Sequence, residues 1–495
     1  MTFSEYRQYD ALGLAELVRS GQITAAELLN IAITRAEEVN QQLNAINHPL
    51  FEYAREQLAN HPPTATQLFG GVPFLIKDLG LALKGTPLRI GSRSTEGMVS
   101  EVDSHLVQLF QKAGLLILGK TNTPEFGLTP FTEPEAFGAT RNPWHTDYTS
   151  GGSSGGSAAA IAAGIVPMAT ASDGGGSIRM PASCCGLFGL KPSRGRLSLG
   201  PGSGESWNGA VVEGCNSRSV RDSAAFLDTF SQPSIGELYY APKPEVPYAD
   251  LLTASPEKLR IGFSTKHPLG LPVDNDCKQA VEETAHLLAD MGHEVEAIPL
   301  PYQREDLTKT FLHLIMGEVS AELKRISKTR GSKVGRSEVE ANTYALSLLG
   351  DAISAGDYAY YRSLWNDLAR RQGNFHQTYH CLLTPTVAMA PFPVGSLQST
   401  PAEKMLVNIL TRLRLGSLMK ANIEQLAEKI FAYMPYTPIA NMTGQPAMSM
   451  PLHWNAKGLP VGVMFTAGIY REDILFKLAA QLEKAKPWME RVAEV

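Results

Sequence analysis

The chain has 495 residues, of which 43% are hydrophobic and 19% are charged, and its formal net charge at pH 7 is −5. This composition is typical of a globular protein that buries a large core, and the length fits two or three domains or one large α/β domain. The small negative net charge excludes a broad basic surface, so we expect no nucleic-acid partner.

We expect neither a secretory signal nor a membrane-spanning segment in this sequence. The first residues, MTFSEYRQYD, have neither the basic nor the apolar region of a secretory signal. No run of about 18 apolar residues is present that could cross a bilayer. Five cysteines without a CxxC spacing are typical of reduced thiols, so we expect a cytoplasmic protein with Cys184 and Cys185 as packing residues.

The first part of the chain alternates helical and strand patterns. Thr24 and Glu27 have the form of a capping box, and Gly21 is placed to end a preceding helix. Asp103 is expected to cap a helix that ends at Ala113. We expect helices over 12–18, 25–40, 104–113 and 157–163, and strands over 71–78, 115–119 and 165–171.

The second part begins with a surface connection over 233–260 and is mostly helical over 305–375, with a break at 331–335. Leucines 406, 410 and 413, together with Ile409, have the spacing of a helix face that packs in a core or lines a substrate pocket. We expect strands over 259–264, 380–386 and 459–465, and helices over 275–291 and 473–485. The alternation predicts an α/β fold with a mixed central β-sheet covered by helices on both faces.

No pattern in the sequence indicates a metal site. His376 and His380 have the i, i+4 spacing of two ligands on one helix, but no third ligand accompanies them. A solvated helix face is the ordinary explanation of such a pair. We therefore expect neither a metal nor another cofactor.

Residues 150–177 contain two clusters of glycine and serine, around Ser153 and Ser177. Glycine permits positive φ angles and close approach of main-chain N–H groups to a ligand, and serine hydroxyls act as nucleophiles or proton relays. Three interpretations compete: a GxSxG nucleophile elbow at Ser153 or Ser154, a phosphate-binding loop, and a serine–serine–lysine relay for acyl transfer.

The first two interpretations have little support. A GxSxG pattern carries little information in a segment so rich in glycine, and no histidine of the chain stands in a distinctive setting for an α/β-hydrolase triad. The glycines at 174–176 lack the following lysine that would bind phosphate.

The relay interpretation agrees with a family resemblance. Stretches that include GVPFLIKD at 71–78, GGSSGGS at 151–157 and SDGGGSIR at 172–179 closely resemble the amidase signature family of serine hydrolases. NMTGQPA at 441–447 and GLPVG at 458–462 resemble the C-terminal end of these proteins. The resemblance implies one domain over 1–495, with a core over about 65–230, a variable and mostly helical substrate-side region over about 231–430, and the C-terminal part of the core over about 431–490.

The resemblance also implies a role for each matching residue. Ser177 matches the nucleophile that is acylated, Ser153 matches the relay serine that follows a cis peptide bond, and Lys77 matches the general base. The main-chain N–H groups that match the oxyanion hole are those of Gly174, Gly175, Gly176 and Ser177.

The chemistry of this arrangement is coherent. A serine hydroxyl is a weak nucleophile until a base removes its proton. The pKa of lysine is ordinarily about 10.4, so Lys77 must be desolvated to be neutral near pH 7, and the apolar run before it suits such burial. Ser153 would pass the proton of Ser177 to Lys77 and later return it to the leaving amine.

Several further residues are assigned to the site with supporting roles. Asp173 and Arg179 flank the nucleophile, and with Ser154 they are expected to form polar scaffolding. By resemblance, Asn122 and Glu125 belong to a loop that approaches the site, and Gly127 lines the substrate pocket. Structural hydrogen bonding is the alternative role for these loop residues.

Two short stretches of the sequence bear on which branch of the family the chain resembles. Glutamine-hydrolysing amidotransferase subunits carry a Ser-Leu-Asp-Gln-x-Gly stretch where this chain reads SWNGAVVEGC over 206–215, which disfavours that alternative and its partner subunits. Residues 132–138 and 172–177 look more like bacterial amidases and 6-aminohexanoate-cyclic-dimer hydrolases. We expect an enzyme that hydrolyses a linear or cyclic small-molecule amide, outside the peptide bonds of proteins. The oligomeric state stays open, a homodimer included.

Overall fold

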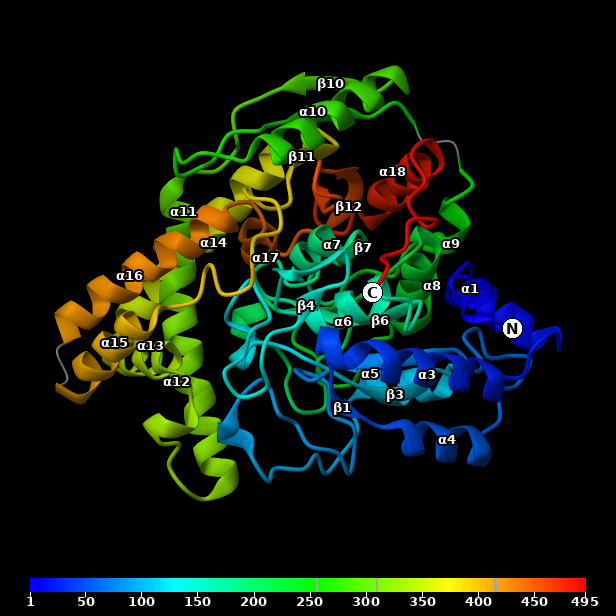
Figure 1. Cartoon of the computed structure of the whole chain (residues 1–495). Helices are drawn as coiled ribbons and strands as arrows, with labels where there is room; N and C mark the ends of the chain where they lie inside the picture. Colours follow the sequence, from blue (N-terminus) through cyan, green and yellow to red (C-terminus); the bar gives the residue numbers. More distant parts are fainter. Residues whose placement is uncertain (255–256, 309, 414–415) are drawn as a thin grey trace.

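A mixed β-sheet runs through the molecule (Figure 1). The computed structural model describes residues 1–254, 257–308, 310–413 and 416–495, and 11 strands of this part form the sheet in the order β1-β3-β2-β6-β8-β7-β12-β13-β11-β9-β10. Strand β2 is parallel to β3 and β6, strand β9 is parallel to β10 and β11, and the other pairs are antiparallel. The strands are β1 (Ile46–Pro49), β2 (Pro73–Lys77), β3 (Leu116–Thr121), β6 (Met168–Asp173), β7 (Phe188–Lys191), β8 (Val212–Ser217), β9 (Arg260–Phe263), β10 (Glu294–Ala297), β11 (Cys381–Pro385), β12 (Ala447–Trp454) and β13 (Pro460–Ala467).

Helices surround the sheet, and a small ribbon of β4 (Arg141–Asn142) and β5 (His145–Thr149) lies outside it. No helix in the described residues is both long and apolar enough to cross a membrane. The helices are α1 (Phe3–Tyr6), α2 (Ala11–Arg19), α3 (Ala25–Leu43), α4 (Phe51–Asn60), α5 (His105–Lys112), α6 (Gly155–Ala162), α7 (Arg179–Cys185), α8 (Val220–Phe230), α9 (Tyr248–Leu251), α10 (Asn275–Asp290), α11 (Arg304–Thr308), α12 (Thr310–Arg330), α13 (Ala341–Ala352), α14 (Ala355–Phe375), α15 (Pro401–Leu413), α16 (Gly416–Tyr433), α17 (Pro438–Thr443) and α18 (Glu472–Ala485).

Strand β8 shows that helices cover both faces of the sheet. The Asn216 side-chain amide donates to the carbonyl of Ile178, directly before α7, at 3.0 Å. The hydroxyl of the next residue, Ser217, lies 2.7 Å from the Ser223 hydroxyl on α8. Because successive side chains of a strand point to opposite faces, α7 and α8 pack on opposite sides. The predicted mixed sheet with helices on both faces is confirmed.

The N-terminal elements follow the local signals of the sequence. The Thr24 hydroxyl and the Glu27 carboxylate form the expected capping box at the start of α3. Helix α5 is the exception, because Ser104 and not Asp103 takes its N-cap position. The Asp103 carboxylate instead accepts a hydrogen bond from the Lys84 main-chain N–H at 2.7 Å, so its capping prediction was wrong by one residue.

The region over 231–430 contributes to two parts of the fold. Its strands β9, β10 and β11 extend the sheet beyond β13, whereas α12 to α16 form a helical layer at one side of the molecule (Figure 1). After this layer the chain returns to the centre of the sheet with β12, which lies between β7 and β13. The helical layer therefore rests against a core built from both ends of the sequence.

One prediction for α15 was wrong. Leu406, Ile409 and Leu413 are 46%, 43% and 60% exposed, and they lie on the outer face of the helix. Its buried face is formed by Val407 and Leu410, which join an apolar cluster with residues of α12, α13 and α16. The sequence spacing identified the helix but selected the wrong face.

The start of α6 provides a test of the fold. A side chain at Gly156 would come within about 2.6 Å of main-chain atoms of Asn122 and Ala45, which cannot move independently of the sheet. We expect Gly156→Ala to lower the free energy of unfolding by about 1–3 kcal/mol, the usual cost of overpacking. Gly373→Ala, in α14 with open space around its Cβ, should instead raise it by about 0.5–1 kcal/mol.

Thermal and urea unfolding of the two variants would check these signs. Equal unfolding midpoints for Gly156→Ala and the wild-type protein would contradict the close packing of α6 against the loop after β3.

Candidate active site

Lys77 lies at the end of β2, a strand whose five residues are all buried. Its terminal nitrogen Nζ donates hydrogen bonds to Ser153 Oγ at 2.7 Å and to Ser172 Oγ at 3.0 Å. Its main-chain N–H donates to Thr170 Oγ1 at 2.7 Å, which fixes the strand end against β6. The lysine is therefore held at both its backbone and its terminal nitrogen.

The environment of Lys77 lowers the pKa of its amine to near neutral pH. Burial lowers the pKa of its amine to about 7, because desolvation disfavours the charged form. The carboxyl groups of Glu213 and Asp173 oppose this effect and raise the pKa. A substantial fraction of neutral amine is consequently present near pH 7, as a general base requires.

Ser153 stands in a turn between β5 and α6. The Gly152–Ser153 peptide bond is cis, as expected from the resemblance. Gly152 packs against the main chain of Phe131, where a Cβ would come within 2.6 Å of its nitrogen. The neighbouring Ser154 hydroxyl donates to the Ser172 carbonyl at 3.4 Å, a structural contact between the turn and β6.

Ser177 follows β6 at the floor of a pocket and is 7% exposed. Gly175 and Ser177 both line this pocket. In the described part of the chain, the N–H groups of Gly174, Gly175 and Ser177 have no hydrogen-bond partner. Three main-chain donors of the turn that carries Ser177 are therefore free.

The expected set of four donors needs one correction. The Gly176 N–H donates to Asp173 Oδ1 at 2.7 Å, so a buried carboxylate already occupies it. The other carboxylate oxygen accepts the Ile178 N–H at 3.1 Å. Asp173 therefore shapes the turn around Ser177 by binding two of its N–H groups.

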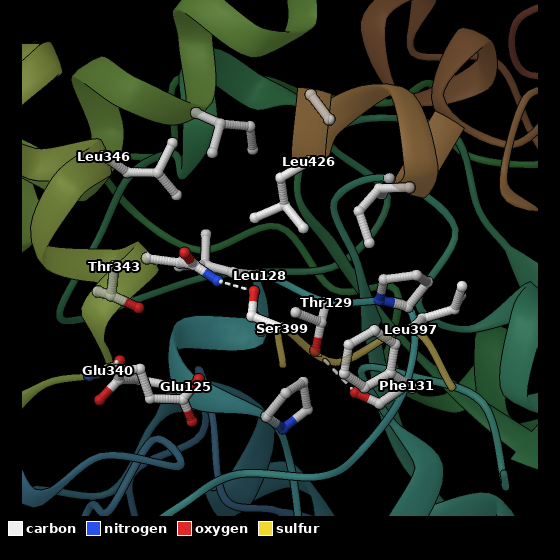
Figure 2. Close-up of a pocket in the computed structure, with 18 of the residues that line it drawn as sticks. Glu125, Leu128, Thr129, Phe131, Glu340, Thr343, Leu346, Leu397, Ser399 and Leu426 are labelled. Carbon is white, nitrogen blue, oxygen red and sulfur yellow. Dashed lines mark hydrogen bonds between the residues drawn. The ribbon is translucent and has the colours of Figure 1, made fainter. Parts of the chain in front are cut away.

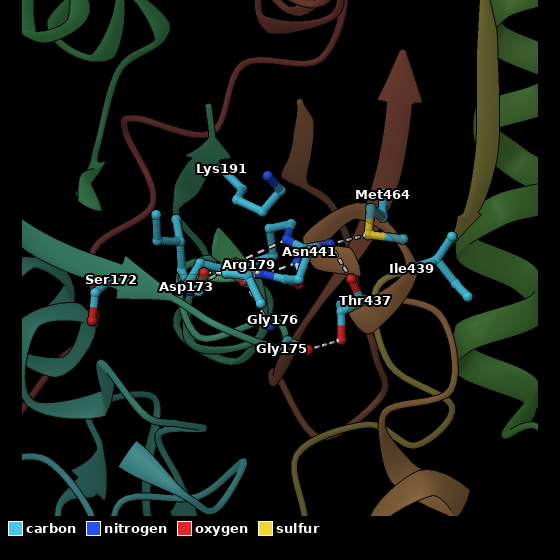
Figure 3. A network of polar contacts seen from close by, with 12 residues as sticks. Ser172, Asp173, Gly175, Gly176, Arg179, Lys191, Thr437, Ile439, Asn441 and Met464 are labelled. Atoms are coloured by element: carbon cyan, nitrogen blue, oxygen red, sulfur yellow. Dashed lines mark hydrogen bonds and ion pairs between the residues drawn. The ribbon is translucent and has the colours of Figure 1, made fainter. Parts of the chain in front are cut away.

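A buried polar network holds Asp173 in place (Figure 3). Arg179 donates to both carboxylate oxygens of Asp173 at 2.9 Å, and the Asn441 amide donates to Oδ1 at 2.8 Å. Burial alone would raise the pKa of Asp173, but Arg179 and the other donors hold it at about 2. The carboxylate thus stays charged through the pH range of ordinary catalysis.

The network also fixes the glycine turn from the C-terminal part of the core. The Thr437 hydroxyl donates to the Gly175 carbonyl at 2.6 Å, and Arg179 donates to the Thr437 carbonyl at 2.9 Å (Figure 3). Arg179 donates as well to Asn441 Oδ1 at 2.7 Å. Asp173 and Arg179 were predicted from the sequence as scaffolding, whereas Thr437 was not predicted and Asn441 was only part of a stretch that resembles the family.

The pocket above Ser177 encloses about 150 Å³ and is mostly apolar (Figure 2). Its walls come from the loop after β3, from the glycine turn and from the helical layer. Among the apolar residues of its wall are Leu128, Phe131, Met180, Trp207, Phe311, Ile315, Leu346, Leu397, Leu426, Phe431 and Met434. The wall residues from the helical layer were not predicted, because an apolar helix face that lines a pocket has the same spacing as one that packs in a core.

Gly127 connects the pocket to the relay. It lines the pocket with φ at 70°, and a Cβ there would lie 3.2 Å from Ser153 Oγ and 2.8 Å from a methyl carbon of Leu79. A side chain at this position would therefore crowd the relay hydroxyl. The structure places Gly127 where the resemblance predicted it.

The two other loop residues differ from each other. Glu125 lines the pocket, but its carboxylate accepts hydrogen bonds from the Ser92 hydroxyl at 2.6 Å and the Glu340 N–H at 2.8 Å. Asn122 lies outside the pocket, fully buried, and donates to the Gly138 carbonyl at 3.0 Å. Asn122 has the structural role that was its alternative, and its assignment as a substrate-binding residue is corrected.

No group of three or more potential metal ligands occurs among the described residues. His376 and His380 follow the end of α14 and do not share a helix, contrary to the expected solvated helix face. His376 Nδ1 lies 3.0 Å from the Tyr379 carbonyl oxygen, and His380 Nδ1 accepts the Arg260 N–H at 2.9 Å. The Nδ1 atom of each ring thus makes a structural contact.

Comparison with known proteins identifies the family of the chain. The sequence pattern of the Amidase family matches residues 27–476. The 6-aminohexanoate-cyclic-dimer hydrolase of Pseudomonas sp. (strain NK87) is 37% identical to the chain and is aligned over 97% of it and 96% of the relative.

Solved structures of this family have a similar fold. A 6-aminohexanoate cyclic dimer hydrolase complexed with substrate superposes with a TM-score of 0.89, at 35% identity and 99% coverage of both chains. A bacterial aryl acylamidase, at 24% identity and a TM-score of 0.84, covers 97% of both chains and shares the fold alone. The chain thus belongs to the amidase family, the enzymes that hydrolyse the carbon–nitrogen bonds of amides.

Proposed function

We propose that the chain hydrolyses carboxylic amides through an acyl-enzyme on Ser177, with Ser153 as proton relay and Lys77 as general base. The observation that carries this proposal is the 2.7 Å hydrogen bond between Ser153 Oγ and a fully buried lysine amine whose pKa is about 7. A buried lysine beside two serines has little structural value, since its desolvation costs free energy. It has clear value as a base.

The first half of the reaction forms the acyl-enzyme. Ser177 loses its proton to Ser153, which passes its own proton to Lys77 as Ser177 Oγ attacks the carbonyl carbon. The carbonyl oxygen becomes an oxyanion, and the free N–H groups of the glycine turn are positioned to bind it. When the C–N bond breaks, Lys77 returns its proton through Ser153 to the leaving amine.

The second half regenerates the enzyme. Water replaces the amine, gives a proton to Lys77 through Ser153 and attacks the acyl carbon. The proton returns to Ser177 Oγ as the acyl–oxygen bond breaks. The products are a carboxylate and an amine or ammonia, and no cofactor takes part in these steps.

The pocket indicates the kind of amide. A cavity of about 150 Å³ with mostly apolar walls accepts a ring-sized or short aliphatic group. The cyclic-dimer hydrolases among the relatives fit this class, so we propose a compact linear or cyclic aliphatic or aryl amide as substrate.

Further features of the proposal concern the cellular setting. All five cysteines are buried and free, which supports a cytoplasmic enzyme. The formal net charge of −5 supports a small-molecule amide rather than a nucleic acid as the partner. Measurement of the molecular mass in solution would decide between a monomer and a homodimer.

The nucleophile can be identified by covalent labelling. A fluorophosphonate probe should label the wild-type protein at Ser177, because this hydroxyl lines the pocket and is the group that the proposed relay deprotonates. Ser177→Ala should lose both labelling and amide hydrolysis, as measured by mass spectrometry and by product release. Ser203→Ala, at an exposed loop position, is the matched control and should behave as wild type. Labelling at Ser153, or in Ser177→Ala, would overturn the assignment.

The pH dependence of kcat/KM should report Lys77. The base must be neutral, so kcat/KM should rise with pH through the lysine pKa of about 7 and fall tenfold per pH unit well below it. Lys77→Ala should lower kcat by about 10²–10⁴-fold at every pH, the usual contribution of a general base. A rise centred near pH 4, or an active Lys77→Ala, would contradict the role of the lysine.

A further inference from the structure

Glu213 is a buried carboxyl group close to the relay that the mechanism above does not use. It lies on β8 and is 2% exposed. The turn that follows Lys77 closes over it, because a Cβ on Gly80 would come within 2.5 Å of Glu213 Oε1. Within the described part of the chain, Glu213 Oε2 has no hydrogen-bond partner.

The sheet places Glu213 beside the contact between Lys77 and Ser172. Glu213 is paired with Ser172 in the antiparallel register of β6 and β8. Directly opposite residues of such a pair share a face, with Cβ atoms about 4.5–5.5 Å apart. Ser172 Oγ in turn accepts the hydrogen bond of Lys77 Nζ at 3.0 Å. The carboxyl group is therefore one side chain away from the amine.

Other buried carboxyl groups of the chain have partners that explain them. Asp173 is held by Arg179, Glu472 forms an ion pair with Arg196 at 3.2 Å, and Asp222 accepts the Ala11 N–H at 2.7 Å. Burial of a carboxyl group without such partners is costly. Glu213 has no comparable structural contact among the described residues. Its burial is therefore better explained by an electrostatic effect on a neighbouring group.

We propose that Glu213 is a positioning residue for proton transfer, whose carboxyl group acts on Lys77 across Ser172 and keeps the amine basic enough to accept the Ser177 proton. This inference rests on the proposed function, because it assumes that Lys77 is the base. When Lys77 takes up the proton, the ammonium charge is stabilised by the negative charge that Glu213 can carry.

The charges around Lys77 are consistent with this role. Burial lowers the pKa of Lys77, and Glu213 and Asp173 are the groups that raise it. Asp173 is engaged by Arg179, and nearby Asp78 lies 3.8 Å from Lys120, so both have other cationic neighbours. Burial likewise raises the pKa of Glu213, and Lys77 opposes that rise. Without Glu213 the amine would be a weaker base than its catalytic step requires.

Glu213→Gln tests the proposal, since the amide keeps the shape of the side chain and removes its charge. The acid limb of kcat/KM should move to lower pH by about one unit or more, the usual effect of an opposite charge at close range. The maximal rate should fall several-fold, because a weaker base accepts the proton less readily. The rate of fluorophosphonate labelling should show the same shift.

Two variants serve as controls. Glu213→Asp retains the carboxyl group and should keep the acid limb near the wild-type position. Glu483→Gln makes the same exchange on α18, where the carboxylate accepts the Val220 N–H at 3.0 Å, and should leave the limb unmoved. An unmoved limb in a folded Glu213→Gln variant would overturn the proposal and show that Glu213 only fills space.

A measurement on the wild-type protein covers the case in which Glu213→Gln does not fold. The ¹⁵N signal of Lys77, assigned by its absence from Lys77→Ala, should titrate in two steps because the two groups interact. A single step would overturn the proposal. Full activity of Lys77→Ala would instead refute the proposed function itself. If Lys77→Ala is inactive and the acid limb of kcat/KM does not move in Glu213→Gln, only the inference about Glu213 is refuted.

Discussion

The removal of Lys77 from water is the constraint on which the site depends. A lysine at the end of an apolar strand loses hydration, and its pKa falls to about 7 because nothing nearby fully replaces that hydration. Hydrogen bonds to two serine hydroxyls offset only part of the desolvation free energy of the amine. A close, hydrogen-bonded ion pair at the same place would raise the pKa of the amine and keep it protonated near pH 7, so the amine could not accept a proton.

The opposite arrangement is found at Asp173, where a buried charge is compensated completely. Arg179 and Asn441 satisfy the carboxylate oxygens, and the carboxylate in turn binds N–H groups of Gly176 and Ile178. A group held this firmly cannot exchange protons near neutral pH, but it can define the backbone. The charge of Lys77 has few stabilising partners, whereas the charge of Asp173 has several. The group proposed to accept a proton is thus distinct from the group that fixes the turn around Ser177.

Local signals in the sequence predicted much of the fold and the centre of the site. The capping box at Thr24, the apolar run before Lys77 and the glycine–serine clusters each depend on neighbours within a few residues, and the resemblance supplied the roles. The faces of α15 and the pocket wall were not predictable in this way, since spacing shows that a helix has an apolar face but not what covers it. Glu213 was hidden for the same reason, because only strand pairing brings it beside Ser172.

The residues proposed for catalysis and most of the residues that line the pocket lie on different parts of the fold. The proton relay and the glycine turn lie on the central strands and on segments fixed to them by buried hydrogen bonds, whereas much of the pocket wall comes from α12, α13 and α16 of the helical layer. Most residues of that layer that line the pocket are apolar, and the polar ones are Asn342 and Thr343 on α13 and Lys404 on α15. The carboxyl groups that raise the pKa of Lys77, Glu213 and Asp173, lie outside this layer. Changes of apolar side-chain volume in the layer can therefore alter which amide fits without changing the charges around Lys77.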